Sequence, residues 1–105
     1  QKLTEYPDYI IYDEEMADKN KGKWSDYFQN ENPIYLEIGC GSGNFTVNNA
    51  EKFLDRNYLA LELRFKRLVM AAVKSEKRDL KNLLFIRKRG EKILDFLGEN
   101  EISGL

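Results

Sequence analysis

The chain has 105 residues, of which 42% are hydrophobic and 33% are charged. This length allows one domain, and the composition supports a core beneath a very polar surface. The sequence has no run of about eighteen apolar residues and no signal-peptide pattern, so we expect a soluble, cytoplasmic protein with no membrane partner. The one cysteine, Cys40, has no second cysteine with which to form an internal disulfide, and the chain has no histidine to activate a thiol. We therefore interpret Cys40 as a small residue that fills a turn, and we expect no bound metal.

The net charge of −1 hides an uneven distribution. Residues 64–92 hold eleven Lys and Arg against three acidic residues, a balance of +8, whereas the rest of the chain has a balance of −9. Such a basic stretch is typical either of a solvated helix face or of a surface that binds an anionic polymer. Arg87 and Lys88 follow a predicted strand at 83–86, and we consider them candidates for contacts with a nucleic-acid backbone.

The N-terminal part of the chain shows little periodicity. Residues 1–20 include a proline and many acidic residues, and we expect an irregular arm or a short helix laid on the domain that residues 21–105 form. Trp24, Tyr27 and Phe28 then lie at i, i+3 and i+4, which predicts a short helix with an aromatic face. That face either covers one side of a sheet or stacks on bases, and we favour the first interpretation.

A short apolar segment followed by three glycines organises the rest of the sequence. Residues 34–38 are rich in branched and aromatic side chains, which predicts a buried, central parallel strand. Gly39, Gly41 and Gly43 then turn the chain into a helix that begins near Asn44. Because glycine lacks a Cβ atom, such a turn bends sharply and lets a ligand lie against the backbone. The segment therefore predicts a site of the nucleotide-binding type.

Glu37 lies within the predicted strand, where a carboxylate needs a donor partner to offset its burial. A nicotinamide dinucleotide site would have the spacing Gly-x-Gly-x-x-Gly, but here the spacing is Gly-x-Gly-x-Gly and Asn44 stands at the position of the last glycine. S-adenosylmethionine carries an ammonium and a sulfonium and no phosphate, so an acid before the turn suits it better. We favour this cofactor over a dinucleotide.

The downstream sequence alternates between helix and strand. The expected elements are a helix that ends near Asp55, a strand at 58–62, a helix with apolar residues from Phe65 to Val73, the strand at 83–86, and a short helix ended by Gly98. This alternation predicts a doubly wound parallel sheet, in which a ligand lies beyond the carboxyl ends of the strands.

Glu62 ends the predicted strand at 58–62, nineteen residues after Gly43. In nucleoside-binding folds an acid at this place accepts the hydroxyls of a ribose. The alternatives are an acid at a helix N-terminus or a partner for Arg64. We favour the ribose role, because it agrees with the glycine turn.

Several segments are distinctive as a set: Lys21-Gly22-Lys23-Trp24, Phe28, Asn32-Pro33-Ile34, Leu36-Glu37-Ile38-Gly39-Cys40-Gly41-Ser42-Gly43-Asn44-Phe45 and Leu61-Glu62-Leu63. Together they resemble the bacterial tRNA (guanine-N7-)-methyltransferase family, from about Lys21 to Leu105. The combination is specific, whereas the glycine turn alone would fit any Rossmann-like methyltransferase.

This resemblance implies an α/β, Rossmann-like, S-adenosylmethionine-dependent methyltransferase fold, of which the chain holds the first three parallel strands with their helices. It implies tRNA as partner and transfer of the S-methyl group to N7 of a guanine in the variable loop. Glu37 would then lie near the amino-acid end of the cofactor and Glu62 at its ribose, with the three glycines in the cofactor-binding turn. Arg89 stands where the family usually has an aspartate or asparagine that helps to hold the adenine.

The family's Asp-Pro-Trp-Pro segment, which forms the guanine side of the site, should begin just beyond Leu105. We therefore interpret the chain as the truncated, cofactor-binding half of such an enzyme and expect the catalytic residues beyond Leu105. A sheet of three strands leaves an apolar edge, so we also expect marginal stability or self-association through that edge. Two alternatives are another Rossmann-like methyltransferase, acting on a small molecule or a different RNA, and a non-catalytic module that binds RNA or a protein partner.

Overall fold

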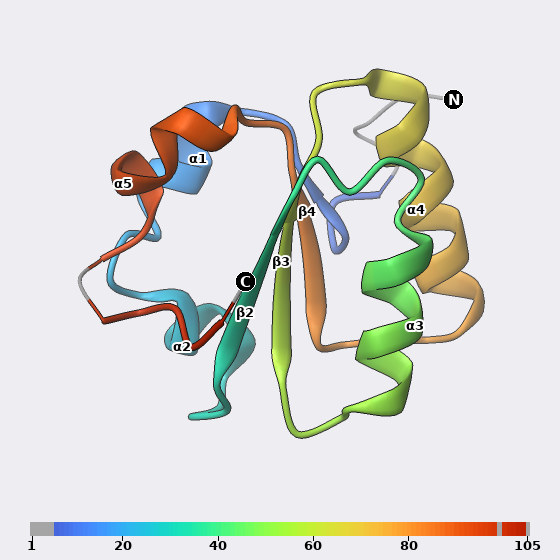
Figure 1. The fold of residues 1–105 in the computed structure, drawn as a ribbon, viewed down its shortest axis with the longest axis horizontal. Helices are drawn as coiled ribbons and strands as arrows, with labels where there is room; N and C mark the ends of the chain where they lie inside the picture. The colour runs from blue at the N-terminus through green and yellow to red at the C-terminus, as the bar shows by residue number, and fades with distance from the viewer. Residues whose placement is uncertain (1–5, 99, 105) are drawn as a thin grey trace.

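A computed structural model describes residues 6–98 and 100–104 of the chain (Figure 1). The strands are β1 (Ile10–Ile11), β2 (Ile34–Ile38), β3 (Asn57–Leu61) and β4 (Leu83–Ile86). The helices are α1 (Glu14–Asp18), α2 (Trp24–Phe28), α3 (Asn44–Lys52), α4 (Phe65–Lys77) and α5 (Ile93–Phe96), with a 3-10 helix η2 (Gly90–Lys92) before α5.

The strands form one parallel sheet in the order β1-β4-β3-β2. The three strands predicted from the sequence are confirmed to within one residue at each end, and Leu36, Leu59 and Leu84 are aligned across them. The fourth strand, β1, comes from the segment that we expected to be irregular or a short helix. Its two isoleucines pair with Phe85 and Ile86 at the outer edge of β4, and two residues are too few to show a periodicity in sequence.

Helices cover both faces of this sheet (Figure 1). α3 and α4 pack on one face, where Ala50, Leu68 and Ala72 form a core with Phe85. α1, α2 and α5 pack on the other face, where Trp24 and Phe96 form a second core with Leu36, Leu59 and Leu84. The aromatic face of α2 therefore covers the sheet, as we predicted.

Trp24 and Glu101 anchor α2 to the C-terminal part of the chain. The Trp24 side chain is fully buried, and its indole Nε1 donates a hydrogen bond of 2.6 Å to the Phe96 carbonyl. The Glu101 carboxylate accepts hydrogen bonds from the amides of Trp24 (2.9 Å), Gly22 (2.9 Å) and Gly98 (2.7 Å). One carboxylate thus satisfies amides at the start of α2 and in the turn after α5, and it holds these two segments together.

The strand order reverses at β2. β3 pairs with one edge of β2, whereas the last described residues pair with the other: the Leu36 amide donates to the Gly104 carbonyl at 2.9 Å, and the Ser103 amide donates to the Ile34 carbonyl at 2.7 Å. The edge that we expected to be bare is thus partly paired, and self-association through it stays a prediction. In open α/β sheets the ligand lies at this point of reversal, beyond the carboxyl ends of the strands.

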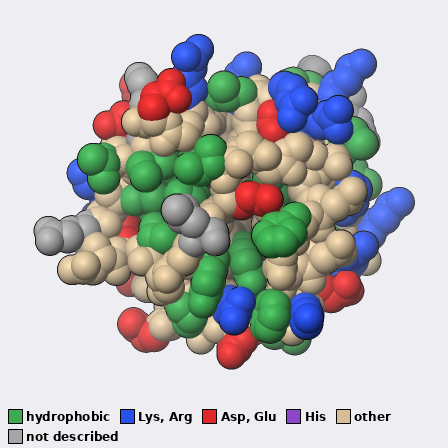
Figure 2. Space-filling model, in the orientation of Figure 1, with side chains coloured by type: hydrophobic (Ala, Val, Ile, Leu, Met, Phe, Trp, Pro, Cys, Tyr) green, Lys and Arg blue, Asp and Glu red, His purple; other side chains and the backbone are tan. Residues whose placement is uncertain are grey.

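The surface separates into regions of different character (Figure 2). Lys and Arg side chains project over α3 and α4, whereas hydrophobic side chains gather over α5 and beside β2. Exposed hydrophobic residues include Ile38, Phe45 and Leu94. None of the helices in the described ranges has the length and apolar character that crossing a membrane requires.

Candidate functional site

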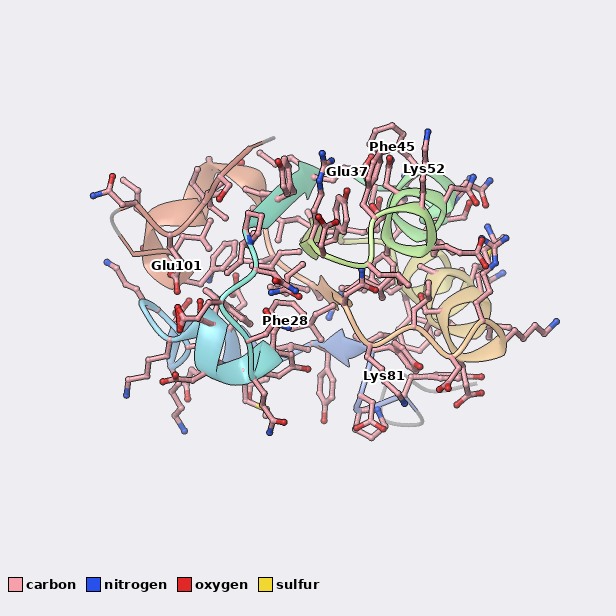
Figure 3. All side chains as sticks on the ribbon, turned by 90° about the horizontal axis from the view of Figure 1, so that it is seen from below. Phe28, Glu37, Phe45, Lys52, Lys81 and Glu101 are labelled. Carbon is pink, nitrogen blue, oxygen red and sulfur yellow. The ribbon has the colours of Figure 1, made fainter. Side chains whose placement is uncertain are left out.

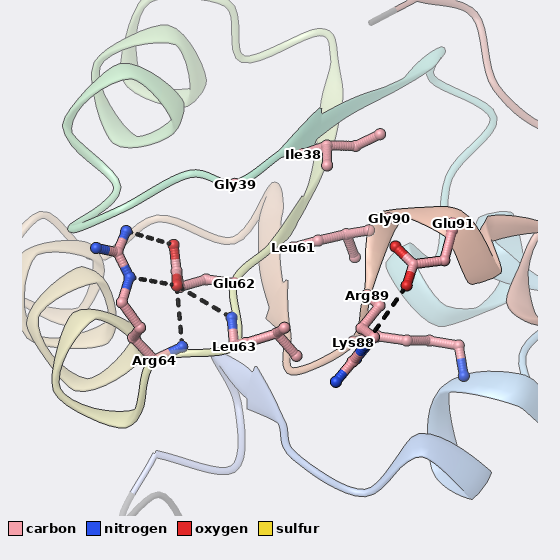
Figure 4. Close-up of a pocket in the computed structure, with 10 residues that line it drawn as sticks. All are labelled: Ile38, Gly39, Leu61, Glu62, Leu63, Arg64, Lys88, Arg89, Gly90 and Glu91. Atoms are coloured by element: carbon pink, nitrogen blue, oxygen red, sulfur yellow. Dashed lines mark hydrogen bonds and ion pairs between the residues drawn. The ribbon is translucent and has the colours of Figure 1, made fainter.

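A pocket of about 390 Å³ opens beyond the carboxyl ends of β2, β3 and β4. It is lined by Ile38, Gly39, Leu61, Glu62, Leu63, Arg64, Lys88, Arg89, Gly90 and Glu91 (Figure 4). Each of the three strands contributes either its last residues or those that follow it. The pocket thus lies where the strand order predicts a ligand site.

The three glycines of the turn adopt left-handed backbone conformations for different reasons. Gly39 and Gly41 have φ of +71° and +59°, and a Cβ atom on either would meet nothing within 4 Å. Gly43 has φ of +81°, and its Cβ would lie 2.7 Å from the Ala71 Cβ of α4. Gly43 therefore permits close packing of α3 on α4, whereas Gly39 leaves open space on the side of the pocket.

Neighbouring elements hold the glycine turn in place. The amides of Gly39 and Cys40 both donate to the Leu61 carbonyl, at 2.9 Å and 3.0 Å. From α4, the Lys74 ammonium donates to the Ser42 carbonyl and hydroxyl, each at 3.2 Å, and to the Asn44 side chain. The role of Lys74 in fixing the turn depends on the packing of α3 against α4, which no local sequence pattern reveals.

The Glu62 carboxylate lies in the pocket (Figure 4) and accepts hydrogen bonds from two loops. Its Oε1 accepts from the Gly41 amide (2.9 Å) and Arg64 Nη2 (3.2 Å). Its Oε2 accepts from the Leu63 amide (3.1 Å) and from the amide and Nε of Arg64 (both 2.9 Å). Figure 4 draws the bonds from Leu63 and Arg64. The Arg64 guanidinium lowers the pKa of Glu62 from 4.5 to about 2; burial opposes this shift, and the amides of Arg64 and Gly41 assist it. Glu62 is therefore an ionised acceptor at the rim of the pocket.

We expect Glu62 to increase the free energy of unfolding at neutral pH and to lose this effect in acid. Its pKa is about 2 in the folded chain and ordinarily 4.5, so its contribution is present above about pH 4.5 and is lost as the pH falls toward 2. A ¹³C NMR titration of the Glu62 carboxyl should have its midpoint near pH 2, and urea unfolding of Glu62→Gln should lose less stability than the wild type on acidification. A midpoint near pH 4.5 would contradict this expectation.

Glu37 does not line the same pocket as Glu62. Glu37 is only half-buried, and its carboxylate accepts a hydrogen bond from the Thr46 hydroxyl of α3, which supplies the donor partner that we expected. Both residues line a smaller cavity of about 190 Å³ with Phe45, Asn49, Arg56 and three residues from β2 and β3, Tyr35, Leu36 and Tyr58. Glu37 and Phe45 lie together at the edge of the sheet beside α3 (Figure 3). The two acids thus line different cavities.

Arg89 lines the pocket, and Arg87 contacts Leu63, a neighbouring residue of its lining. The Arg89 side chain is exposed, and its guanidinium lies 3.7 Å from the Glu91 carboxylate. Arg87 is also exposed, and its Nε donates to the Leu63 carbonyl at 3.3 Å. Gly90 packs closely against the end of β2, because a Cβ atom on it would lie 2.6 Å from the Ile38 side chain.

Lys88 has a different environment from the one we expected. We predicted an exposed cation, but only 2% of its side chain is exposed, and its ammonium lies 3.1 Å from the Asp18 carboxylate and 3.5 Å from the Glu14 carboxylate of α1. Burial opposes its charge, yet the hydrogen bond to Asp18 and the two carboxylates raise the pKa of Lys88 above its usual value. Because α1 covers this residue, we do not include it in a nucleic-acid surface.

The cysteine and the acidic residues of the site give no sign of thiol or metal chemistry. Cys40 is 9% exposed, and burial, assisted by Glu37 and Glu62, raises the pKa of its thiol to about 12, which leaves it protonated and a poor nucleophile. Within residues 6–98 and 100–104, no three His, Cys, Asp or Glu side chains are grouped so that they could hold a metal ion.

Comparison with known proteins identifies relatives among methyltransferases. The family described as "Putative methyltransferase" matches residues 31–105. A bifunctional glycosyltransferase/methyltransferase from Fusobacterium nucleatum subsp. nucleatum is 55% identical over 102 residues, 97% of this chain and 16% of the relative. A tRNA (guanine-N(7)-)-methyltransferase from Clostridioides difficile is 39% identical over 103 residues, 98% of this chain and 47% of the relative. The chain thus spans less than half the length of these curated relatives.

Solved structures with a similar fold are also methyltransferases. A coclaurine N-methyltransferase bound to N-methylheliamine and SAH matches with a TM-score of 0.51 and 21% identity, over 70% of this chain and 21% of that one. The plantazolicin methyltransferase BamL, in complex with a desmethylPZN analog and SAH, matches with a TM-score of 0.50 and 19% identity, over 79% of this chain and 34% of that one. These likenesses confirm the Rossmann-like fold. With its family match over residues 31–105, the chain belongs to this methyltransferase family.

Proposed function

We propose that this chain is the cofactor-binding part of a cytoplasmic, S-adenosylmethionine-dependent tRNA (guanine-N7-)-methyltransferase. The observation that carries the proposal is the position of Glu62, an ionised acid at the end of β3 that faces a pocket beside the open side of Gly39. The relatives named as tRNA (guanine-N(7)-)-methyltransferases support the choice of acceptor.

The residues of the pocket fit this cofactor. Gly39 leaves unfilled the space that a Cβ atom would take, so a ligand is able to lie against the backbone there. We propose that Glu62 accepts the ribose hydroxyls, that Glu37 attracts the ammonium of the amino-acid end across the glycine turn, and that the backbone at Arg89 and Gly90 borders the adenine. Gly41 supports this arrangement, because its amide donates to Glu62 at 2.9 Å.

The proposed reaction makes modest demands on the side chains of this chain. S-adenosylmethionine, when bound, supplies a methyl group made electrophilic by its sulfonium. N7 of guanine carries a lone pair that no proton occupies, so no strong general base is needed, and a chain without histidine is suited to the task. The contribution of Glu62, Glu37 and the glycine turn is to bind and orient, an effect that supplies roughly 7–11 kcal/mol in favourable cases. Exposed basic residues such as Arg87 would steer a tRNA toward the pocket.

The test is calorimetric titration of S-adenosylhomocysteine into the wild-type chain and into Glu62→Gln. We expect binding by the wild type and roughly 10- to 100-fold weaker binding by the variant, since hydrogen bonds to a charged acceptor are lost. Glu76→Gln is the matched control, because it removes the same charge from an exposed position on α4 and should leave the affinity unchanged. Equal affinity in all three proteins would contradict the proposed role of Glu62.

A second candidate keeps the cofactor and changes the acceptor. The relative from Fusobacterium nucleatum is 55% identical, and its name, bifunctional glycosyltransferase/methyltransferase, specifies no tRNA. Methyl transfer to a different RNA or to a small molecule is therefore the alternative. Gel-shift titration with tRNA distinguishes the two, because a tRNA complex that weakens steeply with salt favours the first candidate. If the chain binds neither S-adenosylhomocysteine nor tRNA, the non-catalytic partner-binding module becomes the better interpretation.

A further inference from the structure

The carboxylate of Glu62 is saturated with donors. Five N–H groups point at its two oxygens: the amides of Gly41, Leu63 and Arg64 and the Nε and Nη2 groups of the Arg64 side chain. Figure 4 shows those that come from Leu63 and Arg64. An ionised carboxylate offers about four lone-pair sites. As the structure stands, Glu62 therefore has no capacity to accept the two hydroxyls of a ribose as well.

The five donors differ in how firmly they are held. Three are backbone amides in the glycine turn and at the start of α4, so the fold fixes their positions. The other two belong to the Arg64 guanidinium, whose side chain is 63% exposed, whereas the Glu62 side chain is only 5% exposed. The guanidinium lies on the solvent side of a buried carboxylate, and it is the partner that is free to leave without disturbing the fold.

The two guanidinium donors match a vicinal diol in number and in placement. Nε lies 2.9 Å from Oε2 and Nη2 lies 3.2 Å from Oε1, so the group spans both carboxylate oxygens. A pair of adjacent hydroxyls would likewise donate one hydrogen bond to each oxygen. The amides of Gly41, Leu63 and Arg64 would continue to hold Glu62 in its ionised form during the exchange.

We propose that Arg64 occupies the ribose position in the free protein, and that the cofactor binds by displacing the Arg64 guanidinium from Glu62. This inference rests on the proposed function and deepens it, because it makes Arg64 an intramolecular competitor of the ribose diol. Arg64 keeps the buried acid compensated while the pocket is free and lowers the apparent affinity for the cofactor. Arg64 is thus a residue that tunes binding, separate from the residues that would contact the cofactor.

The experiment is calorimetric titration of S-adenosylhomocysteine into the wild-type chain, Arg64→Met and Arg67→Met. Arg64→Met removes the competing donors, so we expect its dissociation constant to fall about two- to fivefold, the range of an exposed ion pair. Arg67→Met removes an equal charge from an exposed position one turn along α4 and should bind like the wild type. Arg64→Lys keeps the charge without the paired donors and should lie between the wild type and Arg64→Met, which preserves the test should Arg64→Met fail to fold.

Two further readouts report on the exchange itself. The NMR signal of Arg64 Nε–H should be protected in the free chain and should shift and exchange faster when S-adenosylhomocysteine is bound. With the 2′-deoxy analogue of S-adenosylhomocysteine, the increase in affinity caused by Arg64→Met should be smaller. This analogue has one hydroxyl of the diol, so it needs to displace only one of the two guanidinium donors from Glu62.

The outcomes separate this inference from the proposed function. If S-adenosylhomocysteine binds the wild type and Arg64→Met equally, or binds the variant more weakly, then displacement is overturned and the proposed function stands. An Arg64 Nε–H signal unchanged on saturation with S-adenosylhomocysteine would overturn it in the same way. If S-adenosylhomocysteine binds none of the variants, the cofactor assignment fails and this inference fails with it.

Discussion

Replacing Trp24 with alanine is expected to lower the free energy of unfolding by about 3–5 kcal/mol. The side chain is fully buried between α2 and the sheet, and it meets Phe96 edge to face with a centroid distance of 6.4 Å. Alanine would leave a cavity in this core and would remove the hydrogen bond from the indole to the Phe96 carbonyl. Since small domains are stable by only about 5–15 kcal/mol, the loss takes a large share of the total.

Urea unfolding followed by circular dichroism measures this effect. Tyr27→Ala is the matched control, because Tyr27 is on the same helix and is 37% exposed, so its truncation should cost about 1 kcal/mol. Trp24→Phe should fall between the two variants, since it keeps most of the apolar contact and loses the indole donor. Similar midpoints for Trp24→Ala and Tyr27→Ala would show that α2 is not part of the core.

Replacing Gly43 with alanine is expected to destabilise the chain by about 2–4 kcal/mol, through two separate terms. Gly43 has φ of +81°, a conformation that costs an L-residue energy, and the added Cβ would lie 2.7 Å from the Ala71 Cβ and 3.2 Å from the Phe85 ring. α3 would have to move away from α4 and β4 to relieve the contact. Because the glycine turn leads directly into α3, we also expect weaker binding of S-adenosylhomocysteine.

Gly41→Ala separates the two terms. Gly41 has φ of +59° with nothing within 4 Å of its Cβ position, so alanine there carries only the backbone cost of about 1–2 kcal/mol. Thermal unfolding of both variants should therefore rank Gly43→Ala as clearly less stable than Gly41→Ala. Equal melting temperatures would mean that α3 relaxes without cost and that close packing at Gly43 is unimportant.

Local sequence patterns predicted the elements that carry the candidate site. The bounds of β2, β3 and β4 and the amphipathic α3 and α4 follow from apolar runs and from i, i+3, i+4 spacing, which reflect burial on one face. The three glycines predicted a turn before α3 because positive φ angles favour residues without a Cβ. Glu62 was identified by its place at the end of a strand, and the structure puts it in the pocket with Gly39.

Long-range contacts explain the differences from the prediction. Lys88 was expected at the surface, but α1 of the N-terminal segment covers it and supplies two carboxylates, more than 65 residues away along the chain. Glu37 was expected to need a donor partner, and alternation along β2 directs its side chain to the α3 face, where the Thr46 hydroxyl donates to it. No local sequence pattern indicates that α1 contacts Lys88 or that Thr46 contacts Glu37.

The sequence by itself determined the parallel α/β architecture, the glycine turn and the identity of the acids around it, because each depends on residue type and spacing over a few turns of chain. Only the tertiary structure decided how those acids are used. The saturation of Glu62 depends on Gly41 and Arg64 meeting the same carboxylate from two loops, and the burial of Lys88 depends on α1 packing against the segment after β4. Charge and hydrogen-bonding capacity are properties of a residue, but whether they remain available to a ligand depends on which other segments the fold brings beside them.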